Sequence, residues 1–291
     1  MPLDPTFSAA DSRTADQIRR HYEIEKELAA RLRNASKAER SKLYREVYDE
    51  LYRCVPDHPM LTRKVTPEES RALVRRQLEL LSRFLSADLT VVEIGCGDCH
   101  LSFELAQRVK HVYGVEVSEV IAEGMDIPGN FELVISDGTS IPLPDDSIDL
   151  AFSDQLMEHL HPDDAVEQLA NIARVLRPGG AYVCKTPHRL QGPGDVSMYF
   201  DQIATGLHLK EYTYAELADL FRIAGFARTT AYVDKSGTYV RVPVPLMTSF
   251  DSLSSVLFGR RPYQTRQAWL RRRPFTVYLQ GIAFVGWKGH G

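Results

Sequence analysis

The chain has 291 residues, of which 44% are hydrophobic and 25% charged, and its formal net charge at pH 7 is −4. Such a composition is typical of a globular protein with one large domain and a smaller appendage, and it excludes collagenous and histone-like proteins. The four cysteines are too few for a disulfide framework. With its small negative charge, the chain has no general attraction to nucleic acid or to an anionic membrane.

The cellular location is predicted from two features that the sequence lacks. Residues 1–11 contain neither the basic nor the apolar segment that begins a signal peptide. The longest apolar run, residues 275–287, is interrupted by Gln280 and is shorter than the ~18 residues that a membrane span requires. We therefore expect a cytoplasmic protein in a reducing compartment, with no membrane partner.

The N-terminal part is expected to form a flexible terminus, residues 1–12, and a helical cap, residues 13–87. Apolar residues repeat at helical spacing within residues 43–52, and charged residues surround this stripe. Capping boxes begin at Ser36 and Thr66, where a hydroxyl and a Glu three residues later can each bond the other's backbone amide. These signals predict at least two helices with one apolar face each.

After residue 87 predicted strands alternate with predicted helices, the pattern of a parallel sheet with helices on both faces. Seven strands are expected, at residues 89–94, 112–117, 131–135, 148–153, 181–185, 228–233 and 276–285. Residues 236–274 fit neither the helical nor the strand pattern. We interpret them as an insertion in an α/β domain that covers residues 88–291.

The first strand of this sheet ends in Glu93-x-Gly95-x-Gly97, and a helix follows. Glycines at such a turn allow the backbone to approach a ligand closely. Glu116 ends the second strand, where a carboxylate can accept the hydroxyls of a ribose. Dinucleotide-binding proteins need a third glycine where this chain has His100, so the loop favours a nucleoside ligand and disfavours NAD.

Three further motifs follow along the chain: residues 136–150 (SDGTSIPLPDDSIDL), residues 154–160 (DQLMEHL) and residues 176–180 (LRPGG). Together with the glycine loop and Glu116, this succession closely resembles the class I S-adenosylmethionine-dependent methyltransferases. The resemblance is continuous over about residues 89–234, and residues 276–285 resemble the last, antiparallel strand of the family. It implies a Rossmann-like, seven-stranded, mostly parallel sheet, S-adenosylmethionine as the cofactor, and methyl transfer.

The resemblance also implies the residues of the cofactor site. In the family, the glycine loop lies under the methionine part, the acid after the second strand binds the ribose, and the acid after the third strand accepts an adenine amino hydrogen. The expected cofactor-binding residues are Glu93, Gly95, Gly97, Glu116, Val117, Asp137, Gly138, Ser153 and Asp154. Cys99 replaces the family's usual third glycine. The expected site has acids but no Lys or Arg, which suits a positively charged sulfonium cofactor that has no phosphate groups.

The methyl acceptor is predicted from the segment that follows the fourth strand. This segment, residues 153–156, has neither the Pro-Pro-aromatic nor the Pro-Cys motif of the family's members that methylate nucleic-acid bases. We therefore expect a small-molecule acceptor, methylated on a hydroxyl of a sugar or natural-product scaffold, and no nucleic-acid partner. The alternatives are N- or C-methylation, or a catalytically silent protein that keeps the fold to bind a partner. No oligomeric state is predicted.

A hydroxyl loses its proton as it attacks a methyl group, so a histidine is the expected base. The predicted catalytic residues are His208, on a loop after the fifth strand, and His159. The alternatives are His161, His188, Glu158 and Tyr199. We also expect the cap to contact the acceptor through aromatic and polar side chains; these are Tyr44, Tyr48, Tyr52 and Arg53.

Three other clusters have a structural and a functional interpretation. Cys96 and Cys99 have the spacing of a redox or zinc motif, but a zinc site needs a second pair, so we interpret them as loop residues. A metal site is conceivable at Asp154, Glu158, His161 and Asp163, yet this segment is also typical of a turn before a helix, and no metal is predicted. An arginine cluster can bind a phosphorylated or carboxylated acceptor or a nucleic-acid backbone, or it can form a solvated face, which is the commoner case; it comprises Arg260, Arg261, Arg266, Arg271, Arg272 and Arg273.

Overall fold

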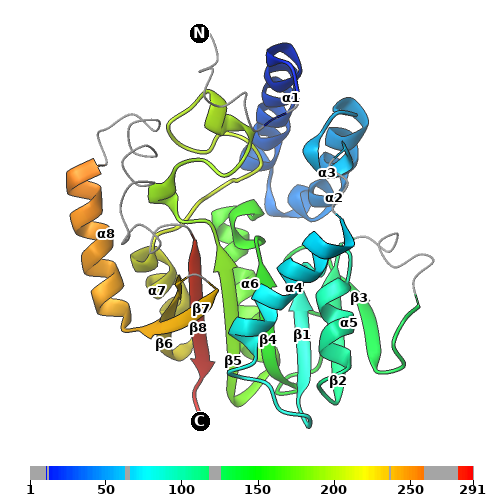
Figure 1. Cartoon of the computed structure of the whole chain (residues 1–291), viewed down its shortest axis with the longest axis vertical. Coiled ribbons are helices and arrows are strands. Elements are labelled where there is room, and N and C mark those ends of the chain that lie inside the picture. Colours follow the sequence, from blue (N-terminus) through cyan, green and yellow to red (C-terminus); the bar gives the residue numbers. More distant parts are fainter. Residues whose placement is uncertain are drawn as a thin grey trace.

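A mostly parallel sheet forms the centre of the computed structural model, which describes residues 11, 13–62, 66–117, 126–235, 237–258 and 281–290 (Figure 1). The strands are β1 (Thr90–Ile94), β2 (His111–Glu116), β3 (Phe131–Ile135), β4 (Ile148–Asp154), β5 (Leu176–Thr186), β6 (Phe226–Lys235), β7 (Thr238–Val242) and β8 (Ile282–Lys288). Their order is β3-β2-β1-β4-β5-β8-β6-β7. Strands β1 to β5 pair in parallel, whereas β8 is antiparallel to both β5 and β6, and β7 is antiparallel to β6.

The α/β fold is confirmed, but the prediction of seven strands was wrong, because the described residues form eight. The additional strand, β7, pairs with β6 across a turn that contains Gly237, whose φ is 91°. Only Tyr239 of β7 is buried, so this edge strand lacks the alternation that identifies a strand. Part of the expected insertion at residues 236–274 is therefore regular, and α8 (Val244–Phe258) follows β7. Residues 276–280 of the last predicted strand lie outside the described residues.

Helices cover both faces of the sheet (Figure 1). On one face lie α4 (Pro67–Leu81), which contacts β7, and α5 (His100–Ala106), which contacts β2. On the other face lie α6 (Pro162–Val175), α7 (Tyr214–Ile223) and α8. The predicted cap, residues 13–87, includes α4, but the structure packs this helix on α5 beside the sheet.

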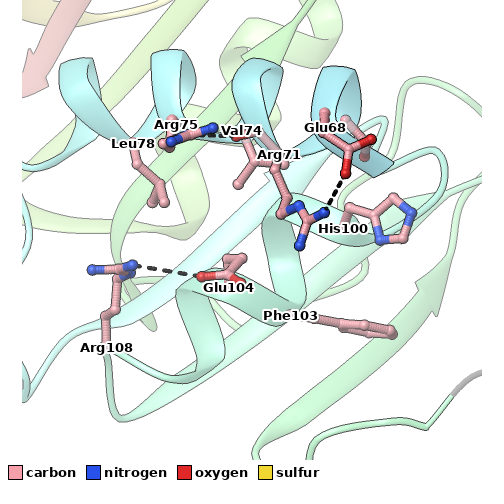
Figure 2. A pocket seen from close by; sticks show the side chains of 10 residues that line it. Glu68, Arg71, Val74, Arg75, Leu78, His100, Phe103, Glu104 and Arg108 are labelled. Carbon is pink, nitrogen blue, oxygen red and sulfur yellow. Dashed lines mark hydrogen bonds and ion pairs between the residues drawn. The ribbon is translucent and has the colours of Figure 1, made fainter. Parts of the chain in front are cut away.

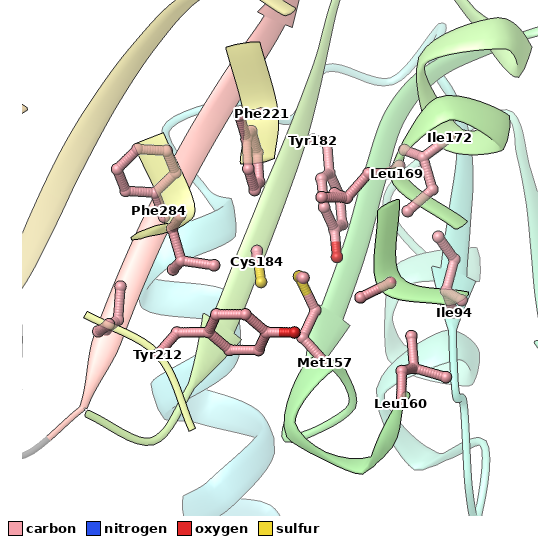
Figure 3. Close-up of a cluster of buried hydrophobic side chains, with 14 of the residues drawn as sticks. Ile94, Met157, Leu160, Leu169, Ile172, Tyr182, Cys184, Tyr212, Phe221 and Phe284 are labelled. Carbon is pink, nitrogen blue, oxygen red and sulfur yellow. The ribbon is translucent and has the colours of Figure 1, made fainter. Parts of the chain in front are cut away.

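The sheet has a separate apolar core on each face because successive side chains of a strand point to opposite sides. On β5, Tyr182 and Cys184 pack with the residues under α6 and α7, whereas Ala181 and Val183 belong to the core under α4 and α5. Figure 3 shows the first core, in which the rings of Tyr182 and Phe221 stack with centroids 5.5 Å apart. A strand buried on both faces is typical of the centre of a parallel sheet.

Three N-terminal helices lie over the carboxyl edge of the parallel strands (Figure 1): α1 (Ala15–Asn34), α2 (Lys37–Cys54) and α3 (Pro59–Thr62). We call them the cap. A buried ion pair joins the cap to the sheet layers, because Nε and Nη2 of Arg40 each donate to an oxygen of Asp164 on α6 at 2.6 Å. The segment between β5 and α7 contacts α1 through residues 196–199. Among the described helices, none is long and apolar enough to cross a membrane.

Candidate active site

The glycine loop after β1 needs residues that tolerate left-handed backbone. Gly95 has a φ of 70° and Gly97 a φ of 48°, a region that side chains disfavour. The Gly95 amide donates to the Val115 carbonyl of β2 at 2.8 Å, which fixes the loop against the neighbouring strand. A Cβ on Gly95 would lie 3.1 Å from the side chain of Leu156. The loop is therefore held close to the segment that follows β4.

Cys99, which replaces the third glycine, keeps the path of the loop. Its φ of 56° and ψ of 7° are the left-handed conformation that glycine adopts, at a cost of about 1 kcal/mol for another residue. The side chain is fully buried, and its sulfur lies 3.6 Å from that of Cys96. Both cysteines are free thiols, and they fill the interior of the loop.

The acid at the end of β2 lies directly over this loop. Glu116 accepts a hydrogen bond from the Gly97 amide through Oε2 at 3.2 Å and from the Val117 amide through Oε1 at 2.8 Å. A narrow cavity opens here, and its walls include four of the expected cofactor-binding residues: Gly95, Glu116, Val117 and Gly138. The structure therefore brings the loop and the acid together at the carboxyl edge.

Asp137 and Gly138 complete this edge after β3. Although partial burial opposes ionisation, hydrogen bonds from the amides of Ser140 and Thr139 hold the pKa of Asp137 below its usual value. These bonds use Oδ1, and no bond to Oδ2 is found among the described residues. Gly138, with a φ of 94°, allows the ring of Tyr44 to approach within 3.0 Å of the position a Cβ would take. Tyr44 therefore packs against the segment that follows β3.

Glu93 lies beneath the loop rather than in the cavity. It is 6% exposed and accepts a hydrogen bond from Oγ of Ser102 at 2.6 Å. Burial raises the pKa of Glu93 to about 8. Its carboxyl group is therefore largely protonated at neutral pH.

The structure does not bring Ser153 and Asp154 to the narrow cavity. Ser153 is fully buried, and its hydroxyl shares a hydrogen bond of 2.7 Å with that of Tyr182 in the core. Asp154 accepts a bond from Nζ of Lys185 at 2.6 Å and another from the Gln77 amide group at 3.0 Å. The side chain of Ser153 points into the core because it alternates with its neighbours along β4.

A second cavity, of about 570 Å³, lies between the cap and the segment that joins β5 to α7. We call it the cap cavity. Its walls carry mainly titratable and aromatic groups, which include His21, Glu25, Tyr48, Tyr52, His58, His159, Asp195, Tyr199 and His208. Gln155 lines the cap cavity and its neighbour Leu156 lines the narrow cavity, so the two cavities adjoin at the end of β4.

The two predicted catalytic histidines lie side by side in the cap cavity. The ring centroids of His159 and His208 are 4.8 Å apart. Nδ1 of His208 is 2.9 Å from Oε1 of Glu211. Burial lowers the pKa of His208, but the bond to Glu211 and nearby acids outweigh it and raise this pKa above its usual value. Because a carboxylate only accepts, Nδ1 carries the proton, and the neutral ring keeps its lone pair on Nε2.

His159 is held in the same tautomer by different partners. Its Nδ1 lies 3.1 Å from the Leu207 carbonyl oxygen, which can only accept, and 2.9 Å from the hydroxyl of Tyr48. Burial lowers the pKa of His159 to about 3, so the ring stays neutral. Its neighbour Glu158 is fully buried, and burial raises the pKa of this carboxyl to about 7.

Two of the alternative histidines have structural partners instead. His188 is fully buried, and its Nε2 lies 2.8 Å from Asp251 of α8. His161 caps α6 by accepting a bond from the Asp163 amide at 3.3 Å. The remaining alternative, Tyr199, lies in the cap cavity and donates to Asp11 at 2.9 Å.

Sequence reasoning missed several residues of the cap cavity. His21 and Glu25 occupy the buried stripe of α1 together with Ile18 and Leu28. Polar residues on an otherwise apolar stripe are a signal that could have identified them. Glu211 lies in an irregular segment, where no periodicity points to its role.

A larger groove, of about 890 Å³, lies between α4 and α5 (Figure 2). Two of its arginines are paired with acids of the groove, since Arg71 lies 3.0 Å from Glu68 and Arg108 lies 3.5 Å from Glu104. No expected site residue lines this groove. The arginine cluster at 260–273 lies outside the described residues.

Known proteins are similar to this chain in sequence and in fold. A family described as a methyltransferase domain matches residues 92–184. A Mycolicibacterium smegmatis protein named a probable S-adenosylmethionine-dependent methyltransferase is 31% identical over 138 residues, which cover 47% of this chain and 51% of that protein. An uncharacterized methyltransferase of Geobacillus thermodenitrificans is 30% identical over 151 residues, which cover 48% of this chain and 70% of that protein. Phosphoethanolamine N-methyltransferase 1 of Haemonchus contortus, solved with phosphoethanolamine and S-adenosylhomocysteine, has a similar fold, with a TM-score of 0.54 and 18% identity over 88% of this chain and 50% of that one.

The fold and the glycine loop define a nucleoside-binding α/β protein. The chain belongs to the class I S-adenosylmethionine-dependent methyltransferases, and S-adenosylmethionine is its cofactor. The residues fit this cofactor, because the described residues in the walls of the narrow cavity include an acid and glycines but no Lys or Arg. The chain spans about half the length of the first curated relatives it matches.

Proposed function

We propose that the protein methylates a hydroxyl of a small molecule, a sugar or natural-product scaffold, that binds in the cap cavity. The observation that carries this proposal is the pair His159 and His208, whose ring centroids lie 4.8 Å apart in the cap cavity, which adjoins the narrow cavity at the end of β4. A hydroxyl is a poor nucleophile until it loses its proton, and a positioned imidazole is the usual base for this step.

We propose that the cofactor is held by residues at the ends of β1, β2 and β3. Glu116 would bind the ribose hydroxyls, Asp137 would accept a hydrogen of the adenine amino group through its free oxygen, and Val117 and Gly138 would contact the adenine. Bound there, S-adenosylmethionine supplies a methyl group that forms a C–O bond with the acceptor as its C–S bond breaks, the electron pair remaining on sulfur.

His208 takes the acceptor's proton on Nε2 in this proposal. Glu211 holds the ring in the required tautomer and stabilises the imidazolium, as the carboxylate of a catalytic dyad does. His159, beside it, orients the acceptor hydroxyl. Tyr48 and Tyr52 supply aromatic walls for the ring of the acceptor.

The charges of the cap cavity disfavour a phosphorylated acceptor. Arg13 is the only Lys or Arg among the described residues that line it, and its guanidinium lies 2.7 Å from Asp11. A phosphate would therefore meet the acids Glu25 and Asp195 without a free cation to pair with. An amine acceptor, methylated on nitrogen, is compatible with these acids and is the second candidate.

The proposal is tested by incubating the full chain with S-adenosylmethionine and panels of sugars, phenols and amines. We expect S-adenosylhomocysteine to form with hydroxyl acceptors, and NMR to show an O-methyl group. Replacement of the base, His208→Asn, should lower turnover by about 10² to 10⁴ and leave the affinity for S-adenosylhomocysteine unchanged. Turnover with amines alone, or wild-type turnover in the variant, would refute the hydroxyl acceptor or the base respectively.

A further inference from the structure

Glu158, His159 and His208 form a cluster whose shape is that of a metal site. One nitrogen or carboxylate oxygen of each residue lies within 4.8 Å of one from each of the others. Ligands at about 2.1 Å from a common cation stand about 3 to 4 Å apart, so a shift of about 1 Å would close them around one ion. His159 and His208 also line the cap cavity, so an ion here would face it.

The hydrogen bonds of His159 and His208 occupy Nδ1 of each ring and leave Nε2 available to a metal ion. Nδ1 of His208 is occupied by Glu211, and Nδ1 of His159 by the Leu207 carbonyl oxygen. In metal sites the non-ligating nitrogen of a histidine almost always donates to a carboxylate or a backbone carbonyl. Both rings already make this outer bond, and no partner for either Nε2 is found in the described part of the chain.

The carboxyl group of Glu158 supplies an independent observation. Thr186 donates to Oε2 at 2.9 Å, whereas Oε1 is buried and has no hydrogen-bond partner among the described residues. A fully buried oxygen without a partner is costly and needs an explanation. A cation bound to Oε1 would satisfy it, and would also balance the charge of a buried carboxylate.

We infer that Oε1 of Glu158 and Nε2 of His159 and His208 bind one divalent transition-metal ion. Two imidazoles and one carboxylate are the ligand set of catalytic zinc and of other nitrogen-preferring divalent ions, whereas calcium and magnesium favour all-oxygen sites. Three protein ligands leave open positions toward the cap cavity. Adjacent hydroxyls of a sugar, a cis-diol, can fill two of them.

The second group of possible ligands in this cavity, His21, Glu25 and His58, is less suitable. Arg13 donates to Nδ1 of His21 at 2.7 Å, so the proton of the neutral ring sits on Nε2, the atom nearest Glu25. A guanidinium beside the site also repels a cation. This group therefore serves as the internal comparison for the first.

The inference depends on the proposed function for its substrate and refines the catalytic step. With the ion in place His208 is a ligand, and the ion replaces its imidazole in favouring the deprotonated hydroxyl, because a bound cation lowers the pKa of a coordinated oxygen. The hydroxyl proton leaves to water in the cap cavity. The oxygen then forms the C–O bond while the C–S bond of the cofactor breaks.

Cobalt binding to the full chain tests the site without turnover. After chelation and desalting, Co²⁺ is added and followed by calorimetry and by its visible absorption. We expect one Co²⁺ per chain, with Glu158→Gln and His208→Gln each weakening binding at least about 10-fold and the outer-shell variant Glu211→Gln weakening it about 10- to 100-fold. The control His58→Gln, in the same cavity, should keep the wild-type affinity.

The outcomes separate this inference from the proposed function. Absence of saturable binding at millimolar Co²⁺, or binding lost in His58→Gln but kept in Glu158→Gln and His208→Gln, would overturn the site. A cis-diol sugar should shift the cobalt spectrum and its monodeoxy analogue should not; equal effects would overturn the diol. If cobalt binds at the cluster but only amines are methylated, the hydroxyl acceptor is refuted and the metal site stands. If the metal-free chain keeps full turnover, the catalytic role of the ion is refuted and His208 stands as the base.

Discussion

Residues with unfavourable backbone angles or unsatisfied polar atoms lie close to the two cavities. Of the three described non-glycine residues with positive φ, Cys99 lies in the glycine loop and Gln155 lies between the cavities, with φ values of 56° and 55°. Glu158, three residues further on, has a buried oxygen without a described partner. Strain and unsatisfied polar groups persist where the surrounding structure enforces them, and they concentrate at functional sites. The segment after β4 therefore joins the two cavities.

Loss of either acid of the cofactor site should weaken binding of S-adenosylhomocysteine. Glu116→Gln and Asp137→Asn keep the shape of each side chain but remove the charge, which should reduce the binding free energy by about 1 to 3 kcal/mol. Calorimetry measures this, with Glu132→Gln on the exposed side of β3 as the control. Wild-type affinity in both variants would mean that the cofactor binds elsewhere.

The raised pKa of Glu93 should make stability fall with rising pH. The unfolded carboxyl ionises near 4.5, whereas burial raises the pKa of the folded group to about 8. Between these two pKa values the folded state holds one more proton than the unfolded state. The contribution of Glu93 to the free energy of unfolding is therefore complete below pH 4.5. It falls by about 1.4 kcal/mol per pH unit as the pH rises toward 8.

Thermal unfolding of Glu93→Gln between pH 5.5 and 8 tests this assignment. The variant keeps the bond from Ser102 and cannot ionise, so its melting temperature should fall less over this range than that of the wild type. Glu132→Gln should follow the wild-type curve. Parallel curves for Glu93→Gln and the wild type would show that Glu93 is not protonated in the folded chain.

At the scale of elements, a buried ion pair helps to attach the cap to the sheet layers. Arg40 of α2 makes two bonds to Asp164 of α6, and the hydroxyl of Tyr44 donates to the same carboxylate at 2.7 Å. The arginine holds the pKa of Asp164 below its usual value against the effect of burial.

Removal of Arg40 should therefore destabilise the chain strongly. Arg40→Met leaves the buried carboxylate of Asp164 without its cation, which costs about 3 to 5 kcal/mol. Arg45→Met, at an exposed pair with Asp49, should change stability by less than about 0.5 kcal/mol. Urea unfolding measures both, and an equal small change would show that the ion pair does not anchor the cap.

Most elements could be predicted because their patterns are strong and local. The alternation of strands and helices gave the sheet from β1 to β6, and the capping boxes at Ser36 and Thr66 mark the starts of α2 and α4. β7 escaped prediction because an edge strand with one buried residue has no alternation. The cap cavity could not be predicted in full, because its walls come from α1, α2 and a long irregular segment that only tertiary packing brings together.

At the scale of the whole molecule, the two cavities adjoin at residues 155–156. The narrow cavity lies among the ends of β1, β2 and β3, and the cap cavity lies beyond β4 and β5. This division matches the general rule that open α/β sheets bind ligands at the carboxyl ends of their strands. In the proposed function, the reacting atoms lie between the glycine loop and the pair His159 and His208.

A crystal structure of the full chain with S-adenosylhomocysteine tests this account most directly. We predict that the adenosine lies between the glycine loop, Glu116 and Asp137, and that the sulfur faces the cap cavity within reach of an acceptor held at His159 and His208. Density for the ligand in the groove between α4 and α5, or a sulfur that faces away from the cap cavity, would contradict it.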